Sequence, residues 1–295
     1  MATQAVAQEP VDLPRFGGRS SYLWYTIRRS TSAQAGIVLL TCILLAALAG
    51  PALWQIDPAV TDAPPLAPPD LLLPFGSDQF GRDLLSRVLN GIRLDLAIAV
   101  FVALLATILG STIGVLVGYV GGWVDQVLMR VTDVMLAFPG FILALSIAAF
   151  LGNDIHNVII AIAIAYTPVM VRLVRGQALS LRSAQFILAS RTIGAPSWWI
   201  MLLHMLPNTL SPILIQTSLF TAWAVLDTAG LSFVGVGIRP PTPELGSITG
   251  EGAAFMVSGA WWFAILPGIV IVLVVLALSL IGDAVRDILD PRTTR

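Results

Sequence analysis

The carboxylate of Asp227 is the group whose surroundings most favour a chemical role. It is the only charge in an apolar stretch over residues 208–234. If that stretch spans a membrane, a buried ionisable group indicates a functional site, such as the lining of a solute pathway where it would meet an ammonium group. The alternative is a structural hydrogen bond to a neighbouring helix near the outer end of the span.

The other reactive or metal-binding side chains do not form a site. His156 and His204 fall on opposite sides of the membrane that the apolar spans define, so they cannot share a metal ion. Ser232 has no histidine partner that would make it a nucleophile. Cys42 is the single cysteine, which excludes a disulfide within the chain. All sixteen basic residues are arginine, so the chain can form neither a P-loop nor a Schiff base, because both need lysine.

The composition indicates an integral membrane protein. Of the 295 residues, 57% are hydrophobic and 11% are charged, against about 45–50% and about 25% in soluble proteins. A bilayer core is crossed by about 20 apolar helical residues. Six stretches meet this requirement, namely 33–54, 96–119, 132–151, 157–177, 208–234 and 262–282. The net charge of −1 excludes the basic face that nucleic-acid binding needs.

The distribution of arginine predicts the orientation of these spans. With the N-terminus inside, twelve arginines lie in inner segments, and four lie in outer segments, namely Arg82, Arg87, Arg93 and Arg239. Inner loops of membrane proteins carry such an excess of positive charge. We therefore expect both termini in the cytoplasm, with a tail over residues 1–30 and a membrane domain over residues 31–295.

Charged residues near the inner ends of two spans have simple explanations. Arg130 and Asp133 are three residues apart on one helix face, which predicts an ion pair between them. Arg172 and Arg175 end the fourth span and are interpreted as inner anchors.

The outer loop over residues 55–95 has two halves. The first is rich in proline and should be extended. The second, GRDLLSRVLNGIRLDL, places apolar residues at helical spacing, with Arg82, Arg87 and Arg93 elsewhere on the helix. This pattern predicts an interfacial helix that lies on the outer membrane surface.

The inner loop over residues 178–207 is the unusual connection. The segment over residues 180–191 predicts about three helical turns. Gly194 is a helix stop, and Pro196 opens a second helix that continues to Pro207. A helix, a turn and a second helix make either a knob that docks in the groove of another protein or an interfacial helix that follows the membrane. The residues alone favour neither alternative.

Several segments of the sequence resemble a known family. Ala189, Gly194 and the Leu206-Pro207 pair resemble the coupling signature of permease subunits in ATP-driven bacterial importers. Five longer segments resemble the dipeptide/oligopeptide/nickel permease family, namely FGSDQFGRDLLSRVLNGIR at 75–93, GYVGGWVDQVLMRVTDVMLAFP at 118–139, VRLVRGQALSLR at 171–182, GLSFVGVGIRPPTPELGS at 230–247 and GDAVRDILDPR at 282–292.

The resemblance implies a type I ABC importer permease, an all-α integral membrane protein of six transmembrane helices with an interfacial outer helix and a cytoplasmic coupling helix. It implies the second permease of a pair, the one with the shorter outer region, in a bacterial cytoplasmic membrane. The implied partners are a second homologous permease, one or two cytoplasmic P-loop ATPase subunits, an external substrate-binding protein and membrane lipid. ATP and Mg would belong to the ATPase subunits, so we expect neither a cofactor nor enzyme activity in this chain.

The resemblance also implies site residues. The residues expected to dock on the ATPase are Gln185, Phe186, Ala189, Ser190, Arg191 and Gly194, where small side chains allow close approach and Gly194 permits the bend. Asp227 and Thr228 are expected in the substrate pathway, because related permeases more often carry the acidic residue at the position of Thr228.

The expected substrates are dipeptides or short oligopeptides, although similar permeases also handle nickel complexes and glutathione. A different class, an ion-coupled secondary transporter acting without an ATPase, would use Asp227 as its proton carrier. Such transporters carry inverted repeats, and the sequence contains no convincing repeat. A membrane-embedded enzyme would need a cluster of ionisable groups in one leaflet, and no such cluster is visible in the sequence.

Overall fold

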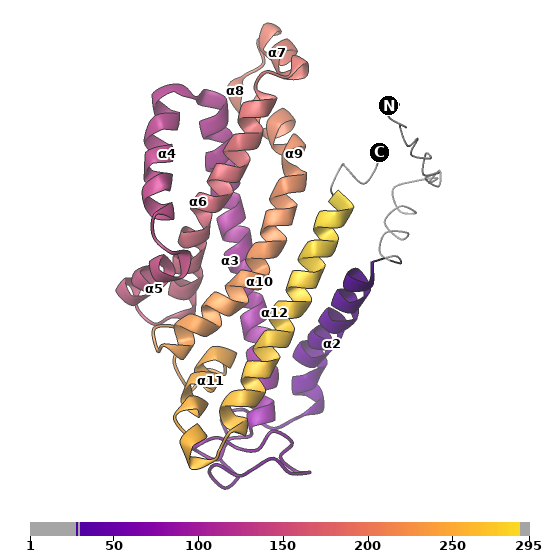
Figure 1. The fold of residues 1–295 in the computed structure, drawn as a ribbon, viewed down its shortest axis with the longest axis vertical. Helices are drawn as coiled ribbons and strands as arrows, with labels where there is room; N and C mark the ends of the chain where they lie inside the picture. Colours follow the sequence, from indigo (N-terminus) through magenta and orange to yellow (C-terminus); the bar gives the residue numbers. More distant parts are fainter. Residues whose placement is uncertain (1–27, 29, 290–295) are drawn as a thin grey trace, which may run out of the picture.

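The protein is a bundle of long helices (Figure 1). The computed structural model describes residues 28 and 30–289, and within them every regular element is a helix. Five helices of this part are long and apolar enough to cross a membrane, and a sixth span results if one bent pair of helices is counted as a span. This confirms the predicted all-α membrane fold. The five are α2 (Thr31–Leu53), α3 (Leu84–Val120), α6 (Ile155–Leu181), α10 (Leu210–Phe233) and α12 (Trp262–Leu289). The tail predicted over residues 1–30 lies outside the described residues, apart from residues 28 and 30.

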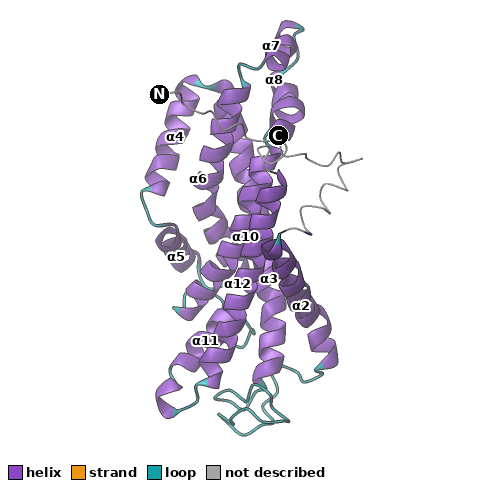
Figure 2. Ribbon diagram, turned by 45° about the vertical axis from the view of Figure 1, so that its right-hand side comes forward, coloured by secondary structure: helices purple, strands orange, loops and turns teal. Residues whose placement is uncertain are grey.

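Helix α3 lies at the centre of the bundle and packs most extensively against α6. Glycines at every fourth position of α3 face α6, where a Cβ atom on Gly110, Gly114 or Gly118 would lie within 2.8 Å of a Cβ atom of α6. Such a stripe lets two membrane helices approach closely. Helices α10 and α12 pack against α3 and against one another, and α2 lies against α12 and α3 (Figures 1 and 2).

The predicted interfacial helix is wrong as a separate element. Its residues are helical, but they form the first turns of α3 and continue directly into the span. Arg82 and Arg87 do not lie on an exposed face, because both are buried beside Asp78 and Glu251. Their guanidinium groups lie 2.5 Å and 2.7 Å from the Asp78 carboxylate, and that of Arg87 lies 3.1 Å from Glu251. These buried ion pairs hold the outer loop against the end of the bundle that carries the short helix α11 (Leu245–Ala253).

The third predicted span is broken into α4 (Gly122–Leu136) and α5 (Gly140–Leu151). The two helices meet at 92°. Pro139 explains the break, because it has no backbone N–H and disfavours helical backbone in the residue before it. A continuous helix over residues 132–151 is therefore wrong, although both halves are helical and apolar.

A short helix, α11 (Leu245–Ala253), connects α10 to α12. Its three glycines give it a low helix propensity, which is why it is not among the predicted elements. They also let it pack closely, since a Cβ atom on Gly246 would lie 2.2 Å from the Ala229 carbonyl oxygen.

The buried side chain of Glu244 caps α11. Its carboxylate oxygens accept hydrogen bonds from the backbone N–H groups of Gly246 and Ser247 at 2.8 Å and 2.7 Å. Asp95 of α3 accepts one from the neighbouring N–H of Leu245 at 3.3 Å. Burial raises the pKa of Glu244 to about 7, even though these hydrogen bonds favour its charged form.

Candidate functional site

The most prominent feature of the fold is the loop between α6 and α10, which protrudes beyond the bundle (Figure 1). After α6 the chain turns and forms α7 (Gln185–Thr192) at the tip. The helix begins later than the residue 180 that the sequence predicts. Gly194 follows in a left-handed conformation with φ of +78°, which glycine adopts without steric cost. The predicted helix stop at Gly194 is confirmed.

The second predicted helix of this loop is also confirmed. Pro196 precedes the first turn, where its missing N–H costs nothing. The helical stretch then runs without a break, and its central turn has π-helical hydrogen bonding. Its three parts are α8 (Ser197–Trp199), η1 (Ile200–Met205) and α9 (Leu206–Asn208).

The tip of the loop exposes large apolar side chains. Ile193 is 80% exposed and Trp198 is 59% exposed. Phe186 and Leu188 on α7 are exposed as well. Together these four residues form what we call the tip surface. Several exposed apolar side chains on one protruding segment favour an interaction site.

The six residues expected to dock on an ATPase divide into two groups. Gln185, Phe186, Ala189 and Gly194 are exposed on the loop. Ser190 and Arg191 point inward. The hydroxyl of Ser190 donates to the Phe186 carbonyl oxygen at 2.8 Å, and the Arg191 guanidinium lies 4.6 Å from the ring centre of Tyr119 at the end of α3.

Arg191 joins the loop to the end of α3, and contacts within the loop stabilise it, so the tip surface has a defined position. Ile187 and Ile200 are fully buried, and the ring of His204 lies 4.5 Å from that of Trp199. Leu188, Ile193 and Trp198 are not among the predicted docking residues. The signal that would have found them is their apolar character within a connection between two spans.

A second candidate feature is a cavity of about 390 Å³ at the bend between α4 and α5. Asp227 of α10 lies in its wall, and the hydroxyl of Tyr166 on α6 donates to this carboxylate at 2.7 Å. Tyr166 stacks on Phe220 with ring centres 4.8 Å apart, and Trp223 meets it edge-on. The lining comes from four helices and comprises Met135, Leu136, Phe138, Gly140, Ala165, Tyr166, Val169, Trp223, Leu226 and Asp227.

The structural hydrogen bond to a neighbouring helix is present. The same residue lines a cavity, and its place in a solute pathway stays a prediction. Thr228 does not share this cavity. Its side chain is fully buried, and its hydroxyl has no hydrogen-bond partner among the described residues. A carboxylate among aromatic rings can receive an ammonium group, which the rings also attract.

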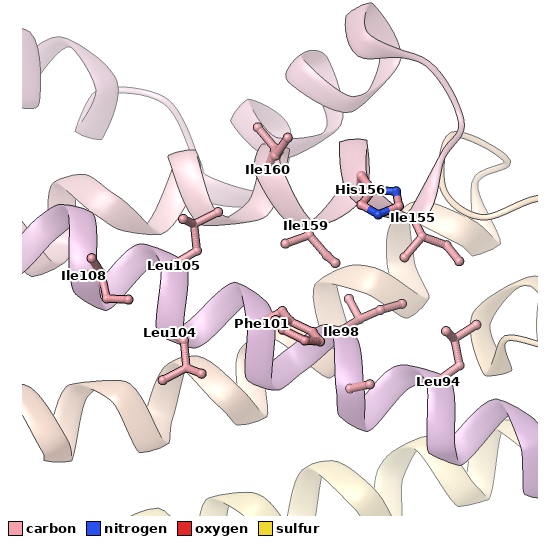
Figure 3. A pocket seen from close by; sticks show the side chains of 11 residues that line it. Leu94, Ile98, Phe101, Leu104, Leu105, Ile108, Ile155, His156, Ile159 and Ile160 are labelled. Atoms are coloured by element: carbon pink, nitrogen blue, oxygen red, sulfur yellow. The ribbon is translucent and has the colours of Figure 1, made fainter.

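A larger cavity, of about 620 Å³, lies between α3 and α6 and has a different character (Figure 3). Its lining is aliphatic or aromatic except for His156 at one end. It offers no carboxylate and so suits an apolar occupant rather than a charged solute. His156 lies in the first turn of α6 and His204 in η1. The described residues contain no cluster of three His, Cys, Asp or Glu side chains that could hold a metal ion.

A helical membrane bundle with a protruding helix-turn-helix and an internal cavity has the architecture expected of a transmembrane transport subunit. Residues 110–295 match the family described as "Binding-protein-dependent transport system inner membrane component". The chain belongs to this family of multi-pass transport permeases.

Curated relatives agree with this assignment. The chain is 39% identical to the dipeptide transport system permease protein DppC of Alkalihalophilus pseudofirmus over 90% of its length and 88% of the relative's. It is 42% identical to a putative peptide transport system permease protein of Brucella suis over 90% of each chain. It is 48% identical to the glutathione transport system permease protein GsiD of Shigella flexneri over 74% of its length and 72% of the relative's.

Proposed function

We propose that this permease forms half of the pathway through which an ATP-driven importer moves dipeptides or short oligopeptides. The relatives are named for dipeptide, peptide and glutathione transport. Peptides with a free amino terminus and glutathione share an ammonium group and at least one amide bond. In our proposal that ammonium group meets Asp227 on its way through the cavity, between the rings of Tyr166 and Trp223.

The observation that carries the proposal is the tip surface. The chain has no lysine for a P-loop, so in an ATP-driven importer the hydrolysis takes place in another subunit. An exposed apolar surface held in a fixed position, at one end of a bundle that spans the membrane, fits the groove of a cytoplasmic ATPase. In our proposal the end that carries α7 faces the cytoplasm, together with both termini, and the end that carries α11 faces an external binding protein.

The other half of the pathway would come from a second homologous permease, with this chain as the second of the pair. ATP and Mg would be held by the ATPase subunits. The role of this chain would be mechanical: it carries movement from the tip surface to the cavity and contributes no catalytic group to hydrolysis.

Purification of the tagged chain from its native membrane in mild detergent, with mass identification of its companions, tests this proposal. We expect a second six-span permease and one or two P-loop ATPases. Reconstituted with the binding protein, the complex should take up a dipeptide only with ATP. A lone chain that moves solute without ATP would contradict the proposal and support the ion-coupled alternative. Uptake of nickel complexes or glutathione in preference to dipeptides would change the substrate alone.

A further inference from the structure

Helix α4 is attached to the bundle more loosely than the other long elements. Among the residues of α4, all of which the structure describes, Thr132 alone is buried. Its neighbours are α6 along its length and α3 near its start, and it forms one edge of the molecule (Figure 2). Apolar packing therefore contributes little to the position of α4.

Two ion pairs connect α4 to α6 instead. The Arg175 guanidinium donates from Nε and Nη2 to both carboxylate oxygens of Asp125, at 2.5 Å and 2.7 Å. Closer to the bend, Nη2 of Arg172 lies 2.5 Å from Asp133. We call these four residues the α4–α6 clasp. The predicted pair within α4 is wrong, because Asp133 binds Arg172 of the neighbouring helix.

The two pairs differ in strength. The Asp125–Arg175 pair is bidentate, and the side chains are only 17% and 28% exposed, which favours a strong and directional interaction. The Asp133 and Arg172 side chains are 54% and 55% exposed, so water weakens that pair. A polar cavity of about 290 Å³ between the helices, lined in part by Asp125 and Asp133, shows that side chains do not fill the space there.

Both ends of α4 can change direction. Gly121 precedes it and Gly122 is its first residue, with φ of +67° and +63°, a conformation that other residues rarely adopt. Pro139 follows it at the 92° bend. Helix α4 thus begins and ends where the chain changes direction, and it is positioned in between by the clasp.

The clasp lies between the two functional features of the chain. Helix α6 ends at Leu181, and α7 begins at Gln185, so movement of the tip surface acts directly on α6. At the other end of α4, Met135 and Leu136 form part of the wall of the Asp227 cavity. A displacement of α6 reaches that wall through α4 only if the two helices move together.

We propose that the α4–α6 clasp makes α4 follow α6, so that movement of the tip surface opens and closes the wall of the Asp227 cavity. This inference rests on the proposed function. Asp125 and Arg175 are then positioning residues, because their role is to hold α4 on α6. Their loss should separate hydrolysis from transport while the complex still assembles.

The test uses the complete importer with Asp125→Asn or Arg175→Gln in this chain, reconstituted in liposomes. We expect uptake to fall by about tenfold, the effect of losing a charge-assisted hydrogen bond, while ATPase activity stays within about twofold of the wild type. The matched controls are Gln126→Ala and Arg130→Gln, which change polar residues of the same helix and cavity that form no ion pair among the described residues. Both controls should transport normally.

Two further measurements separate positioning from folding. Asp125→Arg combined with Arg175→Asp restores an opposite-charge pair and should recover most of the lost uptake. Spin labels at Val127→Cys and Gln177→Cys, in a Cys42→Ser background, should show a narrow distance distribution that Asp125→Asn broadens.

Normal uptake by the single variants, or an unchanged distance distribution, would overturn the proposal. A parallel loss of uptake, ATPase activity and copurifying subunits would also overturn it, because the clasp would then be needed for assembly alone. A wild-type complex without ATP-driven uptake would contradict the proposed function itself, which is a different result from any of these.

Discussion

Helix α6 packs against two neighbours in opposite ways. Against α3 it meets the glycines Gly110, Gly114 and Gly118, and the two backbones are so close that no added side-chain atom would fit. Against α4 it meets charged groups across a polar cavity. Close packing fixes a helix in one position, whereas ion pairs on a thinly packed helix can hold it in more than one. The comparison suggests that α3 and α6 form one rigid body, and that α4 is a part that moves.

Adding a side chain to the glycine stripe should break the interface between α3 and α6. We expect this change to have the largest effect of all the variants, because it affects folding itself. In Gly114→Leu the new Cβ atom would lie 2.8 Å from the Val174 Cβ and 2.9 Å from the Val171 carbonyl oxygen. A backbone atom cannot move aside as a side chain can. The loss of folding stability should therefore exceed the usual cost of overpacking, which is about 1–3 kcal/mol. We expect most of the folded, monodisperse protein to be lost in size-exclusion chromatography.

The matched control for this variant is Gly176→Leu on α6, because a Cβ atom at that position meets no other atom within 4 Å. It introduces the same side chain into a helix and should leave the yield unchanged. Equal yields of the two variants would show that the stripe is not a close contact.

A bulky residue at the tip of the loop should disturb docking of the ATPase at the tip surface, which follows α6. It should leave the packing of α6 against α3 intact. In Gly194→Trp, we expect fewer ATPase subunits to copurify and uptake to fall by about tenfold, equivalent to about 1.4 kcal/mol of binding free energy. Gly259→Trp is the control, since Gly259 also has a positive φ and open space, +93° against +78°. Both variants carry the same backbone strain, so an equal loss of ATPase subunits would refute a role specific to the tip surface.

The cavity beside the movable helix should distinguish charged from neutral solutes. We expect Asp227→Asn to lower the uptake of a dipeptide with a free amino terminus by about tenfold. It should have little effect on the N-acetylated dipeptide, which carries no ammonium group. Thr228→Val is the control, because Thr228 is buried outside the cavity lining. If Asp227→Asn changes the uptake of both peptides equally, Asp227 is structural.

A third interface, between α11 and α10, combines glycine packing with a buried acid, and its effect should be the smallest. Because the pKa of Glu244 is raised from 4.5 to about 7, the folded protein holds this proton more tightly than the unfolded chain. The stabilisation that this bound proton contributes is fully present below pH 4.5 and is lost as the pH rises to about 7. The thermal midpoint should therefore decrease over this range in the wild type.

In Glu244→Gln the side chain stays neutral, and this decrease should be reduced. The control is Asp62→Asn, which removes an exposed carboxylate of the outer loop and should leave the pH profile as it is. A Glu244→Gln profile identical to that of the wild type would mean that titration of Glu244 does not contribute.

The sequence predicts those parts of this molecule that depend on local signals. Apolar length located the spans, and Gly194 followed by Pro196 located the helix-turn-helix. Arg87 was placed on an exposed face because its partner Glu251 lies 164 residues further along the chain. Asp133 was paired within its own helix for the same reason: spacing along one helix says nothing about the charges on the next. The inward orientation of Arg191 depends on Tyr119, which belongs to another helix.

The central claim is that the tip surface docks on an ATPase, and site-specific cross-linking tests it most directly. In a Cys42→Ser background, one cysteine is introduced at Ile193 and, separately, one at Val257 near α11, positions that are 80% and 99% exposed. A cleavable cross-linker is applied to the intact complex in native membranes. We predict a cross-link from Ile193→Cys to a P-loop ATPase and none from Val257→Cys. The Ile193→Cys cross-link should weaken when the complex is trapped with ATP in a different conformation. No ATPase adduct at Ile193→Cys, or an equal one at Val257→Cys, would contradict the claim.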